Sequence, residues 1–363
     1  MSQTVYEKLR HLMSLNPMGC PPEKEILDIL ELLFTENEAQ VALGLGFFPF
    51  SAQEVSRRTD IDESTVIIHL ESLANKGVVF ARKKNGIWGY ALVNTFHLFE
   101  NPFRKGIHDD LIEKLTPLWK RYFPVLSKEF GSNKVSISRV IPINKKVKAS
   151  SEVLPYEQVS YLIKNAKSIG IGHCACRELQ QNCSAPKEAC LMFDNTCNYL
   201  IERGYAKQIT KQEAFQKIKE FDEAGLVRLV NNTQDKLEFV CHCCSCCCGF
   251  LRAASKFGNL NAFARSGFVP ERDLEKCTGC GTCASSKCPV NCIEMEGEIP
   301  DVSLGDCIGC GICATICPND AITLIRGVEL PPPPANLMEF GMNILQEKGT
   351  LEDFIRVNTP KAI

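Results

Sequence analysis

The pattern of apolar and polar residues in 23–93 predicts three helices followed by a hairpin of two strands. Apolar residues recur at helical spacing in EKEILDILELLF (23–34), a second short helix is expected over SAQEVSRRTD (51–60), and a third follows it. Two strand-like runs, VVFARKK and IWGYALV, flank a turn at Asn85 and Gly86. We therefore expect a helix-turn-helix unit that ends in a hairpin.

The third helix, DIDESTVIIHLESLANKG, has a recognisable start and one apolar face. Asp60 with Glu63 three residues later is typical of a capping box. Ile67, Leu70 and Ala74 share one face of the helix at this spacing. We expect that face to pack on the core.

The unit resembles winged-helix domains of the MarR and ArsR kinds, and this resemblance implies a DNA-binding fold. Its charges argue against that use, because residues 51–76 carry five acids against three bases. Asp62 and Glu63 stand where a recognition helix needs basic or amide side chains. Only the basic run at 82–84 in the hairpin suits a phosphate contact. The sequence therefore favours docking to protein over binding to DNA.

The segments on either side of the cysteine-rich region are harder to interpret. Residues 94–154 form a basic connection with a helix expected around 111–130 and a short strand around 136–142. Near the other end, Pro331 to Pro334 predict a stiff spacer. The sequence EFGMNILQEKGTLEDFIRV after it is helix-like, and we expect it to pack on a core or on a second subunit.

Two cysteine runs near the C-terminus are the most informative feature of the chain. CTGCGTC leads to Cys288-Pro289, and CIGCGIC leads to Cys317-Pro318. This is the spacing of bacterial ferredoxins with two [4Fe-4S] clusters, in which the distant fourth cysteine of each half completes the cluster of the other. Zinc knuckles use paired Cys-x-x-Cys motifs instead. The expected ligands are Cys277, Cys280, Cys283 and Cys317 for the first cluster, and Cys307, Cys310, Cys313 and Cys288 for the second.

The two halves of this ferredoxin region form an internal repeat. EKCTGCGTCASSKCPVNCIEM aligns with GDCIGCGICATICPNDAITL when one residue is gapped. The gap predicts a longer loop after Cys283, where four residues precede Cys288. Cys292 aligns with Ala321, so we expect it to be a spare thiol and not a ligand.

A second field of cysteines lies upstream, in residues 155–270. Two blocks, GHCACRELQQNCSAPKEACLMFDNTC and FVCHCCSCCCGF, hold eleven thiols together with His173 and His242. A helix around 211–224 and a hairpin around 226–240 separate the blocks. Cysteines at this density indicate metal binding, because core packing does not require such clustering. The candidate ligands of an additional centre are Cys174, Cys176, Cys183, Cys190, Cys241, Cys243, Cys244, Cys246, Cys247 and Cys248.

Three other interpretations of these cysteines stay open. Structural zinc needs only four such ligands, and adjacent pairs suit dithiol chemistry. The seven-residue spacing from Cys176 to Cys197 resembles a helical stripe, although Pro186 interrupts any single helix there. One or two further iron-sulfur clusters remain the preferred prediction, because they would extend the electron path of the ferredoxin region.

The ordered set of motifs over 155–327 resembles a group of ferredoxin-domain proteins of anaerobes that are described only as 4Fe-4S binding proteins. This resemblance implies a redox role and supplies no substrate. Cys-Cys-Gly at 247–249 is also similar to the cysteine-rich domains of heterodisulfide reductases. Those domains carry a separate downstream Cys-x-x-Cys, which this chain lacks outside the ferredoxin motifs.

Composition and charge limit the functional classes. The chain has 363 residues, 21 cysteines and a net charge of −2, and its N-terminus has no apolar segment typical of a signal peptide. We expect a reduced, cytoplasmic protein without a membrane span, in an anaerobic or microaerobic host. Residues 101–150 hold eleven bases against four acids, whereas 271–327 hold nine acids against four bases. The basic segment could therefore dock the ferredoxin region or another acidic molecule.

The sequence thus predicts a multidomain α+β protein that transfers electrons between its clusters, the central metal centre and a redox partner protein. The rival hypothesis is a redox-sensing winged-helix transcription regulator. Motifs for flavin or nucleotide binding are absent from the sequence, so a partner must supply the reductant. The expected segments are a winged-helix-like domain (1–100), a basic connection (101–154), an α/β cysteine-rich domain (155–270), a ferredoxin domain (271–327), and a Pro-rich spacer with a C-terminal helix (328–363).

Overall fold

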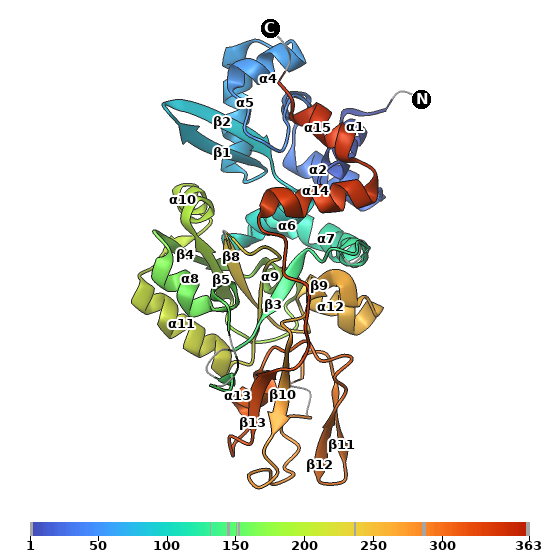
Figure 1. The fold of residues 1–363 in the computed structure, drawn as a ribbon. Helices are drawn as coiled ribbons and strands as arrows, with labels where there is room; N and C mark the ends of the chain where they lie inside the picture. Colours follow the sequence, from blue (N-terminus) through green and yellow to red (C-terminus); the bar gives the residue numbers. More distant parts are fainter. Residues whose placement is uncertain are drawn as a thin grey trace.

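A computed structural model describes residues 3–130, 132–143, 146–149, 151, 153–235, 237–284 and 288–360. The fold is mixed α and β, and its parts are stacked along one long axis (Figure 1). A helical unit with a small hairpin lies at one end, a seven-stranded sheet with its helices lies in the middle, and the segment with the two cysteine runs lies at the other end. Among the described residues, no helix is both long and apolar enough to cross a membrane.

The N-terminal unit contains the helices and the hairpin expected from the pattern. Its elements are α1 (Val5–Ser14), α2 (Lys24–Leu33), α3 (Glu36–Ala42), α4 (Ala52–Thr59), α5 (Glu63–Asn75), β1 (Val79–Lys84) and β2 (Ile87–Leu92). The two strands pair antiparallel around Asn85 and Gly86, both of which have positive φ. Such angles are required by the tightest hairpin turns.

The start of α5 and one residue of its expected apolar face differ from the prediction. Asp62, not Asp60, is the N-cap, because its side chain accepts the Thr65 N–H at 3.0 Å. Asp60 instead ends α4 with a left-handed φ of 58°. Ile67 is 42% exposed and Ile68 is 68% exposed, whereas the buried positions are Val66, Leu70, Leu73 and Ala74. Leu70 and Ala74 are thus buried as members of the expected apolar face, whereas Ile67 is not.

Two helices connect this unit to the central sheet. They are α6 (Thr95–Arg104) and α7 (Asp110–Glu129), and α7 lies close to the 111–130 helix expected from the sequence. Their aromatic side chains pack together, with Phe99 against Trp119 at 5.2 Å and against Phe123 at 5.0 Å between ring centroids. Phe130 stacks on Phe250 at 4.5 Å. The two helices therefore belong to the same core as the cysteine-rich region.

The central sheet has the strand order β6-β4-β5-β8-β7-β3-β9. Every strand pair in this sheet is antiparallel except β3 with β9. The α/β class expected for the cysteine-rich domain, in which helices alternate with parallel strands, is therefore wrong. The strands are β3 (Ser138–Ile141), β4 (Ile169–His173), β5 (Glu188–Phe193), β6 (Lys207–Gln208), β7 (Val227–Asn231), β8 (Phe239–Cys243) and β9 (Phe263–Ala264). The helices are α8 (Val159–Asn165), α9 (Ala175–Gln180), α10 (Asp194–Glu202), α11 (Lys211–Glu223) and α12 (Gly249–Phe257).

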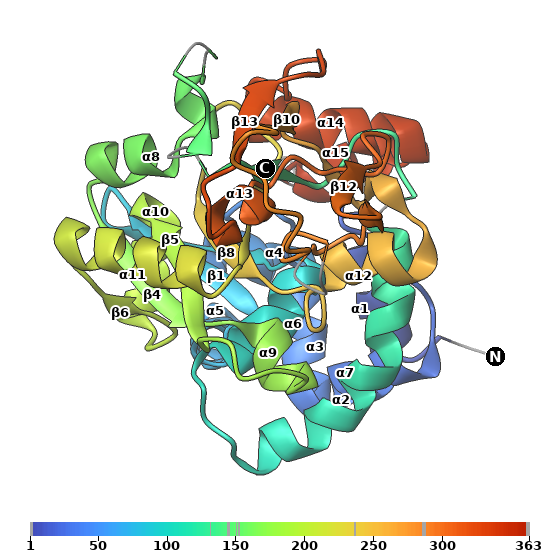
Figure 2. The same ribbon diagram turned by 90° about the horizontal axis from the view of Figure 1, so that it is seen from below.

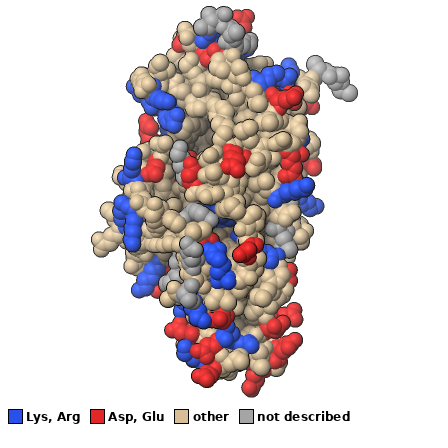
Figure 3. Space-filling view, viewed as in Figure 1, with Lys and Arg blue, Asp and Glu red and all other residues tan. Residues whose placement is uncertain are grey.

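The segment with the two cysteine runs is held together by two small antiparallel sheets. Its elements are β10 (Phe268–Arg272), β11 (Ile293–Glu296), β12 (Ile299–Val302), α13 (Ile312–Ile316) and β13 (Ile322–Arg326). Most of the loop after Cys283, where the repeat predicts an insertion, lies outside the described residues. Figure 3 shows acidic side chains gathered over this end of the molecule.

The basic connection lies against this acidic segment. Lys146 forms an ion pair with Asp320 at 2.5 Å, and Lys148 forms one with Glu271 at 2.7 Å. The Lys148 N–H also donates to the Leu324 carbonyl at 2.8 Å. Some of the bases in the basic connection therefore form ion pairs with acids of the ferredoxin region in the same chain.

The C-terminal tail returns to the N-terminal unit as two helices, α14 (Leu337–Lys348) and α15 (Leu351–Asn358), separated at Gly349. Phe354 stacks on Phe47 with 5.7 Å between ring centroids. The Arg58 guanidinium donates to the Val357 carbonyl at 2.9 Å. The predicted tail helix therefore packs on a core of its own chain, and it is broken into two. Figure 2, viewed along the long axis, has the C-terminus near the centre of the projection.

Candidate metal centres

The first ferredoxin motif surrounds a small cavity together with one cysteine of the second motif. Gly281 and Pro300 contribute to the wall of this cavity. Cys280 is exposed and Cys283 is buried, so the cavity lies close to the surface on one side. Its thiols are those of Cys277, Cys280, Cys283 and Cys317.

The second motif surrounds a matching cavity. Its thiols are those of Cys288, Cys292, Cys307, Cys310 and Cys313. Cys310 is buried, and its carbonyl accepts the Ile143 N–H at 3.2 Å. The extra member is Cys292, whose sulfur is 3.6 Å from that of Cys288. Cys292 thus lies beside this cavity, although the repeat alignment pairs it with alanine.

Glycine is required inside these loops for a steric reason. Gly309 has a φ of +68°, and an added Cβ would collide with the Phe268 carbonyl and the Ser266 hydroxyl. Gly279, its counterpart in the first motif, also has a φ of +68°, and an added Cβ would lie 2.6 Å from the Glu298 carbonyl oxygen. The tight wrapping of both loops therefore depends on residues without a side chain.

The ten candidate ligands of the central region separate into two groups. Six of them line a cavity of about 390 Å³ between the sheet, α6 and α14. Most of the other lining residues are apolar, such as Phe96, Phe239 and Phe340. The six are Cys174, Cys176, Cys190, Cys241, Cys243 and Cys248.

Strand pairing and helix starts bring these six thiols together. Cys190 on β5 is opposite Cys241 on β8, with 3.4 Å between the sulfurs. Side chains alternate along a strand, so Cys243 lies on the same face as Cys241. Cys248 is the N-cap residue of α12, and hydrogen bonds from Cys176 and Cys243 hold its pKa well below the usual value for a thiol. This group can supply several thiolates to one centre.

Buried charges adjoin the same thiols. Arg104 is 3% exposed and pairs with Glu100 at 2.6 Å. Burial lowers the pKa of Arg104, but Cys190, Glu100 and Cys241 together raise it well above its usual value. A fixed cation here offsets the negative charge that thiolates bring into the core. Glu100 also lies within 4.8 Å of the sulfurs of Cys190 and Cys241.

Neither Glu100 nor Arg104 was among the residues singled out from the sequence. They lie on α6, which spans the expected boundary between the winged-helix-like domain and the basic connection, about ninety residues before Cys190. The available signal was a Glu-x-x-x-Arg pair on an otherwise aromatic helix, where a salt-bridged pair is expected on a polar face. Only the fold brings this helix to the thiols.

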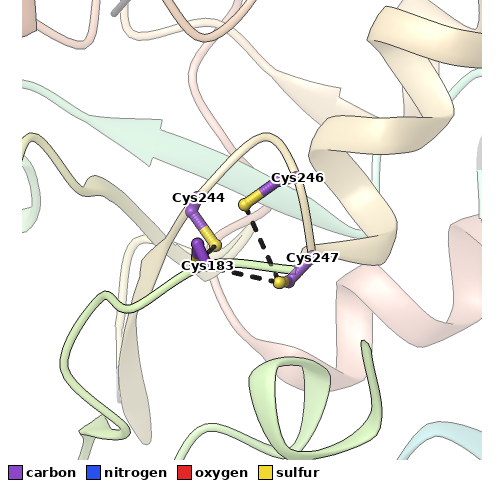
Figure 4. Close-up of side chains that lie close together, drawn as sticks. All are labelled: Cys183, Cys244, Cys246 and Cys247. Carbon is purple, nitrogen blue, oxygen red and sulfur yellow. Dashed lines mark hydrogen bonds between the residues drawn. The ribbon is translucent and has the colours of Figure 1, made fainter. Parts of the chain in front are cut away.

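The remaining four candidates form a separate group, carried by the loop after α9 and the turn between β8 and α12 (Figure 4). A hydrogen bond from Cys247, together with the nearby Arg177 guanidinium, lowers the pKa of Cys244 to about 4 despite partial burial. Arg177, from the CACR motif, is 1% exposed and donates to the Pro186 carbonyl at 2.6 Å. The group consists of Cys183, Cys244, Cys246 and Cys247.

The two histidines have other partners. His173 Nδ1 is 2.7 Å from Glu178, a buried carboxylate that also binds Lys187. His242 Nδ1 is 3.1 Å from the Ala189 carbonyl, and its ring packs on Phe221. Both rings are therefore held by side-chain or backbone contacts and not by the cysteine groups.

Comparison with known proteins supports part of this assignment. The model of one protein family, the 4Fe-4S binding domain, matches residues 300–323. This range contains the second cysteine run. No curated protein and no solved structure matches the chain. The clustered cysteines and the family match indicate an iron-sulfur protein.

Proposed function

We propose that this chain is an iron-sulfur electron-transfer protein with two [4Fe-4S] clusters in its ferredoxin region and a further centre in the cysteine-lined cavity. The observation that carries the proposal is the crossed arrangement of cysteines about two cavities. Cys317 lies with the first motif and Cys288 with the second, as the ligand pattern of bacterial ferredoxins requires. When bound, such clusters supply one-electron transfer.

The residues fit these cofactors in ligand type and in number. Each cavity is bordered by at least four thiols, and thiolates are the ligands of [4Fe-4S] clusters. The glycines with positive φ allow the loops to approach closely and aim N–H groups at the sulfurs. The proposed ligands are Cys277, Cys280, Cys283 and Cys317 in one cavity and Cys307, Cys310, Cys313 and Cys288 in the other.

Exposure distinguishes the two cavities and supports a direction for the path. Cys280 borders the first cavity and is exposed, so a partner protein can approach there. Cys310 borders the second cavity and packs in the same core as Cys176 and Cys243. We infer that electrons enter or leave at the first cavity, and that the second faces the central centre. The acidic side chains at this end of the molecule would favour a basic partner (Figure 3).

The six cysteines of the large cavity are the proposed ligands of the additional centre. Their side chains converge from β5, β8 and the starts of α9 and α12, and Arg104 offsets their charge. An iron-sulfur cluster suits an all-thiol donor set of this size. The apolar remainder of the cavity would exclude water from the centre, and it leaves room for a small substrate.

We propose that the N-terminal unit is a winged-helix domain that docks protein. The three bases of 51–76 are all engaged within the chain: Arg57 with Glu54, Arg58 with backbone carbonyls, and Lys76 with Glu38. The exposed pair Ile67 and Ile68 on α5 would be unfavourable beside phosphates and suits an apolar contact. These features weigh against the transcription-regulator alternative.

Metal and sulfide analysis tests the main proposal. The two ferredoxin clusters require about eight irons per chain, and the additional centre requires an excess over that number. Full-length protein, purified and reconstituted anaerobically, should contain this excess, and dithionite should reduce its clusters as followed by EPR. Iron that stops at the ferredoxin quota would remove the central cluster from the proposal.

The crossed ligands have a matched pair of variants. Cys317→Ala should damage the cluster bound by Cys277 and its neighbours, whereas Cys292→Ala should leave both ferredoxin EPR signals intact. If the Cys292 variant loses a cluster, the proposed ligand assignment is wrong. The close approach of Cys292 to Cys288 makes this a demanding control.

DNA retention tests the alternative. Affinity that comes only from the basic run at 82–84 should fade steeply with salt and show no sequence preference. A sequence-specific footprint at physiological salt would favour the regulator instead.

A further inference from the structure

Four cysteines of the central region lie much closer together than the ligands of an iron-sulfur cube. Cys183 comes from the loop after α9, and the other three come from the turn between β8 and α12. The Cys183 sulfur is 3.7 Å from the Cys244 sulfur and 3.9 Å from the Cys247 sulfur. The sulfurs of Cys246 and Cys247 are 3.8 Å apart. All four sulfurs lie within 4.8 Å of one another (Figure 4).

These distances match the geometry of one tetrahedral ion. Four sulfurs at about 2.3 Å from a zinc ion lie about 3.8 Å from each other in a regular tetrahedron. In a [4Fe-4S] cube each thiolate binds a different iron, so its ligand sulfurs must be farther apart. A complete set of four sulfurs at this spacing therefore indicates a mononuclear site, which a single close pair of sulfurs does not.

The ferredoxin region provides a comparison within the same chain. Its cysteines border two cavities, and one sulfur pair there, Cys288 with Cys292, is 3.6 Å apart. In the part of the chain that the structure describes, they form no set of three sulfurs within 4.8 Å of one another. The four-cysteine group differs from them in this respect.

The surroundings of the group are those of a closed, structural site. The four thiols supply every position of a tetrahedron, so an ion bound there has no open position for a substrate. The Asn182 side-chain amide donates to the Cys246 carbonyl at 3.0 Å and ties the two loops together. The buried Arg177 guanidinium adjoins Cys244 and offsets part of the excess negative charge of four thiolates.

We propose that Cys183, Cys244, Cys246 and Cys247 bind a single zinc ion, separate from the proposed iron-sulfur centres. None of the four borders the large cavity as the structure describes it. Both neighbours of the turn, Cys243 and Cys248, do border it. The zinc site therefore fixes a turn whose two ends present thiols to the cavity, and it gives adjacent cysteines different roles.

Zinc analysis and X-ray absorption on the full-length protein test this site. Protein produced with both iron and zinc, and purified anaerobically, should contain about one zinc per chain with four sulfur ligands at about 2.3 Å. Cys183→Ser should lose most of this zinc while iron and sulfide stay at the wild-type level, because Cys183 is exposed and belongs to no cluster in the proposal. Cys246→Ser should behave in the same way.

Ser245→Ala is the matched control, because it alters the same turn without removing a thiol. It should retain zinc and iron alike. Three results would overturn the proposal: wild-type protein with its full iron content and little zinc, a lone iron with four sulfur ligands at this site, or loss of iron and sulfide together in Cys183→Ser.

The outcome is independent of the electron-transfer proposal. If the additional cluster is absent, iron stops at the ferredoxin quota whether or not zinc is bound. If the zinc site is absent, the zinc content falls whether or not the excess iron is found.

Discussion

Single buried charges set the electrostatic conditions around the central thiols. Arg104 is enclosed by Glu100, Cys190 and Cys241, and burial leaves it little water to screen its charge. A cation in this position favours any state of the centre that carries one more electron. Its effect should therefore be measurable as a reduction potential.

Arg104→Gln should lower the midpoint potential of the central centre. A unit charge at about 7–14 Å and an effective dielectric constant near 20 corresponds to a shift of about 50–100 mV. Arg104→Lys keeps the charge and should shift the potential much less. Potentiometric EPR titration measures both, and equal potentials in Arg104→Gln and wild type would contradict the electrostatic role.

A second residue-scale prediction concerns acid stability. Burial raises the pKa of Glu38. Hydrogen bonds from Lys76 at 2.6 Å, the Thr35 N–H and the Ser72 hydroxyl lower this pKa by more than burial raises it, so the net pKa is below its usual value. Because the folded pKa lies below the unfolded one, this contribution to stability is fully present above the unfolded pKa and is lost as pH falls through the folded pKa.

Glu38→Gln should lower the free energy of unfolding at pH 7 by about 1–3 kcal/mol, since it leaves Lys76 without a carboxylate partner. The difference from wild type should shrink as pH falls below about 4. Urea unfolding of the N-terminal unit at several pH values, followed by tryptophan fluorescence or circular dichroism, measures it. A difference that stays constant down to pH 3 would contradict the ion-pair explanation.

At the scale of elements, the loops of the cysteine runs contain glycines that differ in how much space surrounds them. Gly309→Ala adds a methyl group against the Phe268 carbonyl, and it strains a φ of +68°. Gly281 has the same φ, but the nearest atom to an added Cβ, the Met295 sulfur, is 3.8 Å away. An alanine at Gly309 would cause both a steric collision and backbone strain, whereas an alanine at Gly281 would cause backbone strain alone.

Gly309→Ala should therefore lose the iron of the second cavity, whereas Gly281→Ala should cost only about 1 kcal/mol and keep both clusters. Iron and sulfide content with EPR of the two variants measures this. Equal cluster loss in both variants would mean that the positive φ, and not the collision, limits these loops.

The elements that could be predicted from sequence are those whose signal is local. Periodicity and the Asn-Gly turn located α5 and the β1–β2 hairpin, and the cysteine spacing located the iron-sulfur segment that the family match supports. The N-cap of α5 was misplaced because Asp60 and Asp62 offer equally good capping side chains, and only the left-handed φ of Asp60 separates them. The antiparallel central sheet was not predictable, because its strand order depends on long-range pairing.

The central site required tertiary information for the same reason. The sequence indicated metal binding by ten cysteines but gave no division among them. The division follows from alternation along β8, which directs Cys241 and Cys243 to one face, and from the turn that carries Cys244 to Cys247 toward Cys183. Glu100 and Arg104 come from a distant helix, so spacing in the sequence could not associate them with the thiols.

At the scale of the whole molecule, the tail ties the N-terminal unit to the cavity. Leu337, Phe340 and Leu345 of α14 border the cavity, and Phe354 of α15 packs on Phe47. Contacts of α15 with the N-terminal unit thus hold α14 over the cysteines. Weakening the contact between α15 and the N-terminal unit should therefore expose the cysteines that α14 covers.

Phe354→Ala should increase protease sensitivity and hydrogen exchange of residues 337–358, and it should speed the loss of the central cluster in air. Ile355→Ala is the matched control on the same helix, because Ile355 is 54% exposed. Exchange mass spectrometry and iron release measure the two effects. If the Phe354 variant exchanges like the control, the tail is not held by this contact.

The position of the tail also has a consequence for biosynthesis. Every cysteine of the chain precedes α14, and Cys248, the last one that borders the large cavity, lies about 90 residues before Leu337. At a synthesis rate of about 5–20 residues per second, the ribosome adds those residues in about 4–18 s. The thiols around the cavity are therefore translated before the helix that covers them, which leaves an interval in which an assembly factor can deliver iron and sulfide to an open site. We therefore expect loading of the proposed centre to precede closure of the cavity by α14.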